Sequence, residues 1–397
     1  MSSKVSEYVV LFAAAIPFIF YFLAVYSSSH YFWLSRNHSG QNLDFTPPIS
    51  NLKPVRGLDP DAYENFASFC RQDYPEYELI FCVTDEDDPC TPIIQKLIRD
   101  FPGRQIRLLY CSGHTAINDK VAKLRLMEQA ARYEHIVIND SDVRVDPGYL
   151  RRVIEPLRDL KVGAVTCFYV SPREGSFIER LQTIGMISDF YAGVLVAWQL
   201  DGIQFALGPT MVSTKQRIRG FGGFQVLENR PADDLLFGRL IAEQGVEVRL
   251  LPYAVETVPD FQGLGELLSK RVRWMTVMRF MRPWGHFGLL FTWGLPWTVL
   301  AFFVRPTLGV AATYWGLYLV FRVAITWLIG IQGLKQAGLW KKMPLIPLWD
   351  AIAFLVWLVS FTRTSIRWRG LDYKLRNGQF VSTSETLVSD SATKSDS

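Results

Sequence analysis

The chain has 397 residues, a net charge of +4 and a high aromatic content that includes 12 Trp and 27 Phe. So small a positive charge argues against nucleic-acid binding, which needs a dense basic surface, and we expect no nucleic-acid partner. The five cysteines lie in the polar middle of the chain without the paired spacing of a metal site. We therefore predict reduced thiols that face the cytosol.

The first hydrophobic segment lies close to the amino terminus. Residues 8–26 are uncharged and apolar, and the run is long enough to cross a bilayer as a helix. A cleaved signal peptide would have a basic leading region, a shorter apolar core and a clearer cleavage site. We predict a retained transmembrane anchor.

The middle of the chain, residues 45–284, alternates between strand and helix patterns. Strands are predicted over 49–52, 78–83, 106–109 and up to 138, and helices over 61–71, 92–101 and 119–133. This alternation predicts an α/β domain with a mostly parallel sheet. Ligands of such sheets bind at the carboxyl ends of the strands, which would gather Lys53 and the segments 84–88 and 139–142 in one place.

Two acidic segments follow predicted strands. Asp140 and Asp142 can converge on one hard cation, Mg²⁺ or Mn²⁺, that holds a diphosphate; the alternative is a simple turn. Asp85, Asp87 and Asp88 could bind the base or ribose of a nucleotide, or form a solvated turn before the following proline.

A second acidic pair and a basic motif come later. Asp233 and Asp234 either favour the dipole of a following helix or supply a general base whose pKa is raised by apolar and acidic neighbours. The glycine-rich segment 220–224 forms either a ligand-approaching loop or a turn. Segment 270–274 combines cations with an indole, which could stabilise a departing diphosphate and stack on a sugar, or form an interfacial belt.

Three more apolar stretches follow, at 287–304, 309–331 and 344–362, and define a membrane region over residues 285–363. Arg322 and Asp350 interrupt it; either they pair with each other or Asp350 marks an interface boundary. A basic juxtamembrane segment, 364–380, and a Ser/Thr-rich disordered tail, 381–397, complete the chain. The aromatic stretch 179–204 is predicted as a buried helix and loop of the core, or as the lining of an acceptor site.

The orientation signals conflict. Basic residues on both sides of the middle region place it in the cytoplasm. Three later crossings would then leave the tail outside, whereas its basic start favours the cytoplasm. An interfacial or re-entrant stretch near Pro296 or Pro344 would remove the conflict.

Several motifs together resemble one family. They are the segments 52–60, 73–78, 85–89, 117–120, 140–145 and 367–370. The chain is similar to membrane-embedded inverting glycosyltransferases of the ceramide glucosyltransferase family, a group that includes bacterial hopanoid-biosynthesis glycosyltransferases. The resemblance implies a nucleotide-diphospho-sugar transferase domain of the GT-A, Rossmann-like type between transmembrane helices.

The resemblance also implies residue roles. Asp234 would be the general base, Arg273 would stabilise the leaving diphosphate beside Trp274, and Asp140 and Asp142 would hold the metal. The UDP-sugar donor would contact Lys53, Asp85, Asp88, Lys120, Asp140 and Lys270. Lys270 stands where the family has Gln or Arg, so bidentate contact is in doubt there and Arg271 is a candidate substitute.

These roles imply transfer of a hexose, glucose first, from a UDP-sugar to a hydroxyl of a membrane lipid such as ceramide. The alternatives are a hopanoid-lipid N-acetylglucosaminyl transferase, a processive polysaccharide synthase and a noncatalytic lipid-binding scaffold. The expected location is a bacterial inner membrane, with several crossings and the catalytic domain facing the cytoplasm.

Overall fold

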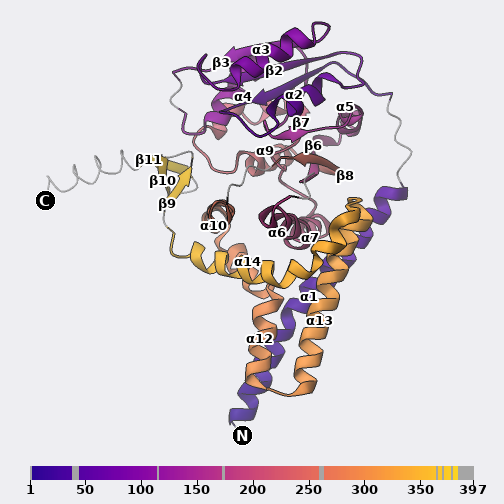
Figure 1. Cartoon of the computed structure of the whole chain (residues 1–397), viewed down its shortest axis with the longest axis vertical. Helices are drawn as coiled ribbons and strands as arrows, with labels where there is room; N and C mark the ends of the chain where they lie inside the picture. The colour runs from indigo at the N-terminus through magenta and orange to yellow at the C-terminus, as the bar shows by residue number, and fades with distance from the viewer. Residues whose placement is uncertain are drawn as a thin grey trace, which may run out of the picture. The chain divides into compact units, whose positions relative to one another are not determined.

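The computed structural model describes residues 2–37, 44–113, 116–171, 175–258, 263–363, 365–368, 371–376 and 379–382 (Figure 1). The chain forms two compact units. Residues 38–174 and 202–260 form the unit that we call the sheet unit, and residues 1–37, 175–201 and 261–397 form the helical unit. The predicted catalytic domain was the uninterrupted segment 45–284, whereas residues 175–201 and the residues from 261 onward belong to the helical unit.

The sheet unit is built on eight strands in the order β3-β2-β1-β4-β7-β6-β8-β5. The strands are β1 (Ile49–Pro54), β2 (Tyr77–Val83), β3 (Gln105–Tyr110), β4 (His135–Ile138), β5 (Val143–Arg144), β6 (Val162–Val170), β7 (Met211–Thr214) and β8 (Glu247–Thr257). β3, β2, β1 and β4 are parallel neighbours, and β6 is parallel to β8, whereas β7 is antiparallel to both β4 and β6. The predicted α/β fold with a mostly parallel sheet is confirmed.

Helices connect these strands. They are α2 (Ala62–Cys70), α3 (Thr91–Asp100), α4 (Asp119–Ala130), α5 (Tyr149–Ile154), α8 (Lys215–Gly220) and α9 (Asp233–Ala242), with short 3₁₀ turns η1 (Glu155–Arg158) and η3 (Phe224–Leu227). Every residue of β1 and β2 is buried, as expected for parallel strands that are covered on both faces. All five cysteines are buried free thiols in this unit.

Three helices of the helical unit lie side by side, with the middle one of the sequence antiparallel to the other two (Figure 1). They are α1 (Ser2–Asn37), α12 (Gly294–Val304) and α13 (Leu308–Thr326), and the π-helical η5 (Trp327–Gly333) extends the last. α12 begins beside Tyr21, whose hydroxyl accepts from Gly294 N (2.9 Å), and ends where Arg305 pairs with Glu7 at 3.4 Å. α13 then returns along α1, ending where Gly333 packs on the ring of Phe32.

The remaining helices complete the helical unit. They are α6 (Phe177–Gly185), the π-helical η2 (Met186–Phe190), α7 (Tyr191–Asp201), α10 (Leu264–Met281), α11 (Pro283–Gly288) with the 3₁₀ turn η4 (Leu289–Phe291), and α14 (Ile346–Ser360), which follows the 3₁₀ segment η6 (Ala337–Leu345). Our prediction placed residues 179–204 in the core of the α/β domain; instead α6, η2 and α7 belong to the helical unit.

α14 does not run back along the bundle. Near its start Asp350 pairs with Arg322, which stacks over Tyr21, and at its end Ser360 contacts His286 in α11, shortly before α12 begins. Figure 1 accordingly shows α14 lying across α1, α12 and α13. The chain therefore leaves α14 at the same end of the bundle where α1 ends, which agrees with an interfacial stretch near Pro344.

By length and composition, four helices of the described part of the chain could cross a membrane. They are Lys4–Arg36, Phe177–Asp201, Leu308–Gly333 and Ala337–Ser360, and the bent pair Pro283–Phe291 and Gly294–Val304 would make a fifth, with an angle of 47° at its break. Three antiparallel strands follow: β9 (Ser365–Trp368), β10 (Leu371–Arg376) and β11 (Gln379–Ser382). The basic segment 364–380 thus contains strands, and the predicted disorder after residue 382 lies outside the described residues.

Candidate active site

The candidate site lies at one edge of the sheet. β1, β2 and β4 are parallel neighbours, so their carboxyl ends bring Lys53 and the segments 84–88 and 139–142 to the same edge, as predicted. Because β7 is antiparallel to β4 and Ile138 pairs with Met211, the residues that precede β7 reach this edge too.

A buried asparagine fixes the start of the Asp140–Asp142 loop. The Asn139 amide nitrogen donates to the Tyr149 hydroxyl (2.7 Å) and to the carbonyl of Pro209 (2.8 Å), and its oxygen accepts from Asn51 Nδ2 at 2.8 Å. Asn139 is fully buried, and these bonds satisfy its side chain in a site closed to water.

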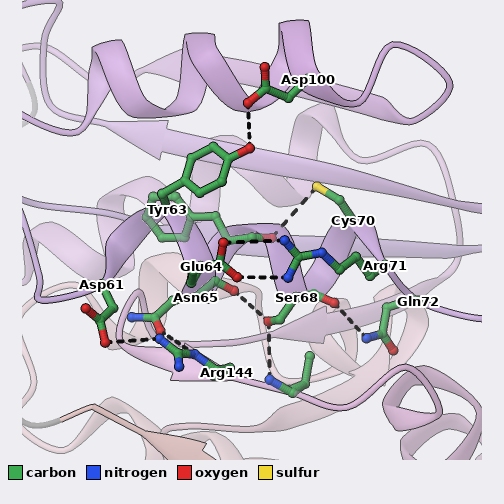
Figure 2. Close-up of polar contacts among 12 residues, drawn as sticks. Asp61, Tyr63, Glu64, Asn65, Ser68, Cys70, Arg71, Gln72, Asp100 and Arg144 are labelled. Atoms are coloured by element: carbon green, nitrogen blue, oxygen red, sulfur yellow. Dashed lines mark hydrogen bonds and ion pairs between the residues drawn. The ribbon is translucent and has the colours of Figure 1, made fainter.

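The polar face of α2 fixes the other end of the loop (Figure 2). Arg144, in β5, donates to Asn65 Oδ1 at 3.1 Å and pairs with Asp61 at 3.3 Å, and Ser68 Oγ accepts from Val145 N at 3.2 Å. The backbone carbonyl of Asp142 accepts from the N–H that follows β8 at 3.0 Å. With both ends held, the two carboxylates between them are preorganised.

Lys120, near the start of α4, joins the two acidic pairs. Its Nζ lies 2.7 Å from Asp140 Oδ1 and 3.3 Å from Asp233 Oδ2. Burial opposes the charge of Lys120, but Asp140 and Asp233 outweigh it and raise the pKa of this lysine. Lys120 therefore stays an ammonium and holds the acids of two distant segments together.

Asp234 has the environment of a base. Its Oδ1 accepts from Leu235 N at 2.8 Å and its Oδ2 from Gly208 N at 3.2 Å. Burial, and then the neighbouring charge of Asp233, raise the pKa of Asp234 to about 6. A carboxylate of that basicity is ionised at neutral pH and can still take a proton from a hydroxyl.

Gly208 sits between the two acidic groups. A Cβ at this position would lie 3.2 Å from Asp140 Oδ2 and 3.3 Å from Asp234 Oδ2, so the absence of a side chain lets both carboxylates approach. Just before α9, Ala232 is held in the left-handed region with φ 55° and ψ 61°. Such strained backbone at a non-glycine residue concentrates at functional sites.

Lys53 is the second cation of the site. It is fully buried, its Nζ donates to the backbone carbonyl of Asp140 at 3.1 Å, and it lies 3.6 Å from the centre of the Phe69 ring. Burial lowers the pKa of Lys53 to about 7, although the carboxylates of Asp142 and Asp140 favour its charge. Contact with a diphosphate would favour the ammonium form further.

The donor set fits a divalent cation that shares a diphosphate. Four acids, at positions 140, 142, 233 and 234, face two lysines, so with the acids ionised the cluster has a formal excess of two negative charges. Among the described residues, no three His, Cys, Asp or Glu side chains are arranged as a metal cage. Mg²⁺ and Mn²⁺ bound through one or two carboxylates complete their shells with substrate oxygens, a role that Asp140 and Asp142 suit.

The acidic loop after β2 divides into two parts. Asp88 is buried and its carboxylate accepts from Gly57 N (3.1 Å) and Cys90 N (3.0 Å), which ties this loop to the one after β1. Asp85 and Asp87 are exposed, and Asp85 Oδ1 accepts from Asp87 N at 3.1 Å. The structure thus gives Asp88 a positioning role, while nucleotide contacts by Asp85 and Asp88 stay predictions.

A neighbouring buried pair had not been singled out from the sequence. Lys123 Nζ lies 3.0 Å from Asp119 and donates to the carbonyl of Val55 at 2.7 Å, and Thr84 Oγ1 donates to Asp119 at 3.4 Å. The pair therefore links α4 to the loops after β1 and β2. The spacing of four residues within a helix was the available signal.

The basic motif lies in α10, in the helical unit. Lys270 Nζ is 5.4 Å from the centre of the Trp274 ring, and the Arg271 guanidinium lies 5.0 Å from Trp274 and 4.9 Å from Trp349. Arg271, the candidate substitute for the missing arginine fork, therefore stacks between two indoles. The roles of Lys270, Arg273 and Trp274 towards a diphosphate stay predictions.

Comparisons with known proteins agree with this arrangement. A sequence profile described as Glycosyl transferase family 21 matches residues 9–381. The chain is 24% identical to "Ceramide glucosyltransferase 1" of Caenorhabditis elegans over 281 residues, which cover 68% of this chain and 60% of that protein. It is 35% identical to a ceramide glucosyltransferase of Komagataella phaffii over 123 residues, 30% of this chain and 24% of that one. The match thus spans 60% or less of the length of these relatives.

A solved structure shares the fold. The mannosyltransferase PcManGT from Pyrobaculum calidifontis, in complex with GDP-Man and Mn²⁺, is 17% identical and gives a TM-score of 0.55, covering 87% of this chain and 99% of that one. At this identity the likeness concerns the fold alone, and it supports the expected glycosyltransferase architecture.

Proposed function

Because the chain belongs to glycosyl transferase family 21, we propose that it is an inverting enzyme that transfers a hexose from a UDP-sugar to a hydroxyl of a membrane lipid. The relatives named ceramide glucosyltransferases favour glucose as the sugar and ceramide as the lipid. The observation that carries the proposal is that the carboxylates of Asp140 and Asp234 both approach the space that a side chain at Gly208 would fill.

Asp234 is the proposed general base. Two backbone N–H groups orient its carboxylate, and its pKa of about 6 leaves it ionised at neutral pH. It would take the proton of the lipid hydroxyl while the oxygen attacks the anomeric carbon and UDP leaves from the opposite face. Lys120 would keep Asp140 and Asp233 in place during this step.

The donor would be bound at the carboxyl edge of the sheet. Asp140 and Asp142 would hold Mg²⁺ or Mn²⁺, which supplies charge stabilisation to the departing diphosphate. Lys53 and Lys120 add positive charge beside it. By the resemblance to the family, Arg273 serves the same purpose and Asp85, Asp88 and Lys270 contact the donor.

We also propose that the sheet unit lies in the cytoplasm. Arg36, Arg279 and Arg363 belong to the end of the helical unit where α1 and α14 end, as does the Lys341–Lys342 pair that precedes α14. This distribution follows the positive-inside rule if α1, α12 and α13 cross the membrane and α14 lies in its interface.

The test uses the full chain in phosphatidylcholine nanodiscs with UDP-glucose, UDP-galactose or UDP-N-acetylglucosamine and a lipid extract. Mass spectrometry should detect a hexosyl lipid, formed best from UDP-glucose. Asp234→Asn should lower kcat at least about 100-fold, the usual loss of a general base, whereas Asp159→Asn on an exposed turn should not. Wild-type turnover by Asp234→Asn would remove the base assignment, and no consumption of any UDP-sugar would refute the function.

A further inference from the structure

Part of the helical unit is polar where an apolar environment is expected. The α6–η2–α7 segment, Phe177–Asp201, is apolar enough to cross a membrane, yet Gln182 and Asp189 flank its Gly185 at positions −3 and +4. That spacing places both side chains on the face of the helix that Gly185 occupies. A π-helical turn begins directly after Gly185, a feature that occurs frequently at functional sites.

An indole from α14 covers this face. A Cβ on Gly185 would lie 2.1 Å from Cε2 of Trp349, so the indole ring packs directly on the glycine. The indole nitrogen Nε1 is bonded to Cε2 and therefore lies close to Gly185 as well. Trp349 is 2% exposed, and its N–H lies beside the carboxylate of Asp189, without a partner in full hydrogen-bond geometry among the described residues. Gln182 Oε1 is likewise buried without a described partner. The Gln182 acceptor thus lies unused near Gly185, and the indole N–H has only the Asp189 carboxylate beside it, although buried polar groups are normally hydrogen-bonded.

Asp189 adds a carboxylate that the neighbouring ion pair does not require. Arg322 is already satisfied by Asp350, by the backbone carbonyl of Ser188 and by Ser188 Oγ (3.1 Å). Asp189 is itself partly exposed, with the charges of Arg322, Asp350 and Arg271 around it. The Arg322–Asp350 pair does not need this carboxylate, and an ionisable group kept within apolar helices is by default a candidate for binding.

The same cluster is continuous with the basic motif of α10. Phe190, the residue after Asp189, lies 6.5 Å from Trp274 between ring centres, and the Arg271 guanidinium stacks between Trp274 and Trp349. Trp349 is therefore fixed from one side by Gly185 and from the other by Arg271. Its N–H cannot turn away to find another partner without loss of both contacts.

We propose that Gln182, Asp189 and Trp349 bind the polar head of the acceptor lipid. The carboxylate and the amide oxygen would accept hydrogen bonds from hydroxyl or amide N–H groups, and the indole N–H would donate to a carbonyl or hydroxyl oxygen. These three side chains would favour an uncharged lipid head with several hydrogen-bond donors, because the carboxylate of Asp189 would repel a phosphate. The description of this lipid as the acceptor rests on the proposed function. Binding of the lipid can be measured without catalysis.

Binding is measured first without any UDP-sugar. The full chain in detergent is titrated with a fluorescent short-chain ceramide, a probe that has two hydroxyls and an amide. Asp189→Asn should weaken binding about 10-fold or more, as expected for loss of a hydrogen bond to a charged group. Trp349→Phe, which keeps an aromatic ring and removes only the N–H, should weaken it about 3- to 10-fold. Asp201→Asn, the same charge change at the exposed end of α7, is the matched control.

Kinetics with UDP-glucose then separate this inference from the proposed function. Asp189→Asn and Trp349→Phe should raise the KM for the lipid and leave the KM for UDP-glucose and the slow hydrolysis of UDP-glucose unchanged. Equal binding of the ceramide probe by wild type, Asp189→Asn and Trp349→Phe would overturn the site, whatever the activity. If the wild-type protein binds the ceramide probe specifically but uses no UDP-sugar, the lipid-binding site is supported and the proposed transferase function is refuted.

Discussion

The Arg322–Asp350 pair offers the sharpest test of how the helical unit is held together. Both side chains are at least 96% buried. Arg322 Nε donates to Asp350 Oδ2 at 2.8 Å, its second nitrogen contacts the other carboxylate oxygen, and the Tyr318 hydroxyl donates to Asp350 Oδ2 at 2.7 Å. Through Ser188 the same guanidinium also fastens η2 to α13.

We expect the single variants Arg322→Met and Asp350→Leu to be strongly destabilised. Each leaves one buried charge without its partner, a loss of about 3–5 kcal/mol, whereas replacing both charges with apolar groups is often neutral. The double variant should therefore be more stable than either single variant. Measured as thermal unfolding in detergent, each single change should lower Tm on the order of 10 °C.

The exposed Arg305–Glu7 pair provides the control. Its two atoms are 3.4 Å apart and Arg305 is 42% exposed, so Arg305→Met should change stability by less than about 1 kcal/mol. If Arg322→Met and Asp350→Leu are individually harmless, or if their effects simply add in the double variant, the pair does not hold α13 and α14 together and the reasoning fails.

Three further predictions concern the sheet unit. The value of kcat/KM should fall below about pH 6, because protonation of Asp234 removes the base. Asp233→Asn should move this fall to lower pH, since it removes a charge that raises the pKa of Asp234. An unchanged pH profile in this variant would contradict the assignment of the base. Gly208→Ala should lower kcat about 10-fold or more while Tm changes little, because the added methyl group crowds two carboxylates. Gly103→Ala, whose methyl group would meet nothing within 4 Å, should leave kcat unchanged. Equal activities of the two variants would show that the space at Gly208 has no role. Chelation should abolish transfer and added Mn²⁺ restore it, and Asp142→Asn should raise the Mn²⁺ concentration needed at fixed UDP-glucose; full activity in excess chelator would exclude the metal site.

The first half of the sheet unit could be predicted from sequence because its signals are local. β2 contains the apolar run 79–83, and α4 begins after Asn118, whose side chain caps the helix by accepting from Val121 N. The later strands are different. β7 has four residues, too few for a pattern, and its conformation is set by pairing with β4 and β6 on either side.

The acidic residues of the site could be named from sequence, but their geometry could not. Asp140 and Asp234 meet only because the antiparallel β7 brings Gly208 to the edge where β4 ends. Likewise, the bridge from Lys120 to Asp233 joins segments that are more than 100 positions apart. Composition also does not distinguish a helix buried in the core of an α/β domain from one that packs among membrane helices, so the assignment of α6 and α7 to the helical unit could not be predicted.

The arrangement of α14 gives the helical unit unequal ends. In the described part of the chain, α1, α12 and α13 meet at the Glu7 end, whereas away from that end α7 packs on α1 and α14 packs on α12, and α6 and α10 pack on α14. In a bilayer crossed by this bundle, the wider end displaces more lipid from one leaflet than the narrow end does from the other. Helices that lie in one interface couple to membrane curvature. In such a bilayer the lateral pressure of that leaflet would act on the helices that carry Asp189 and Trp349.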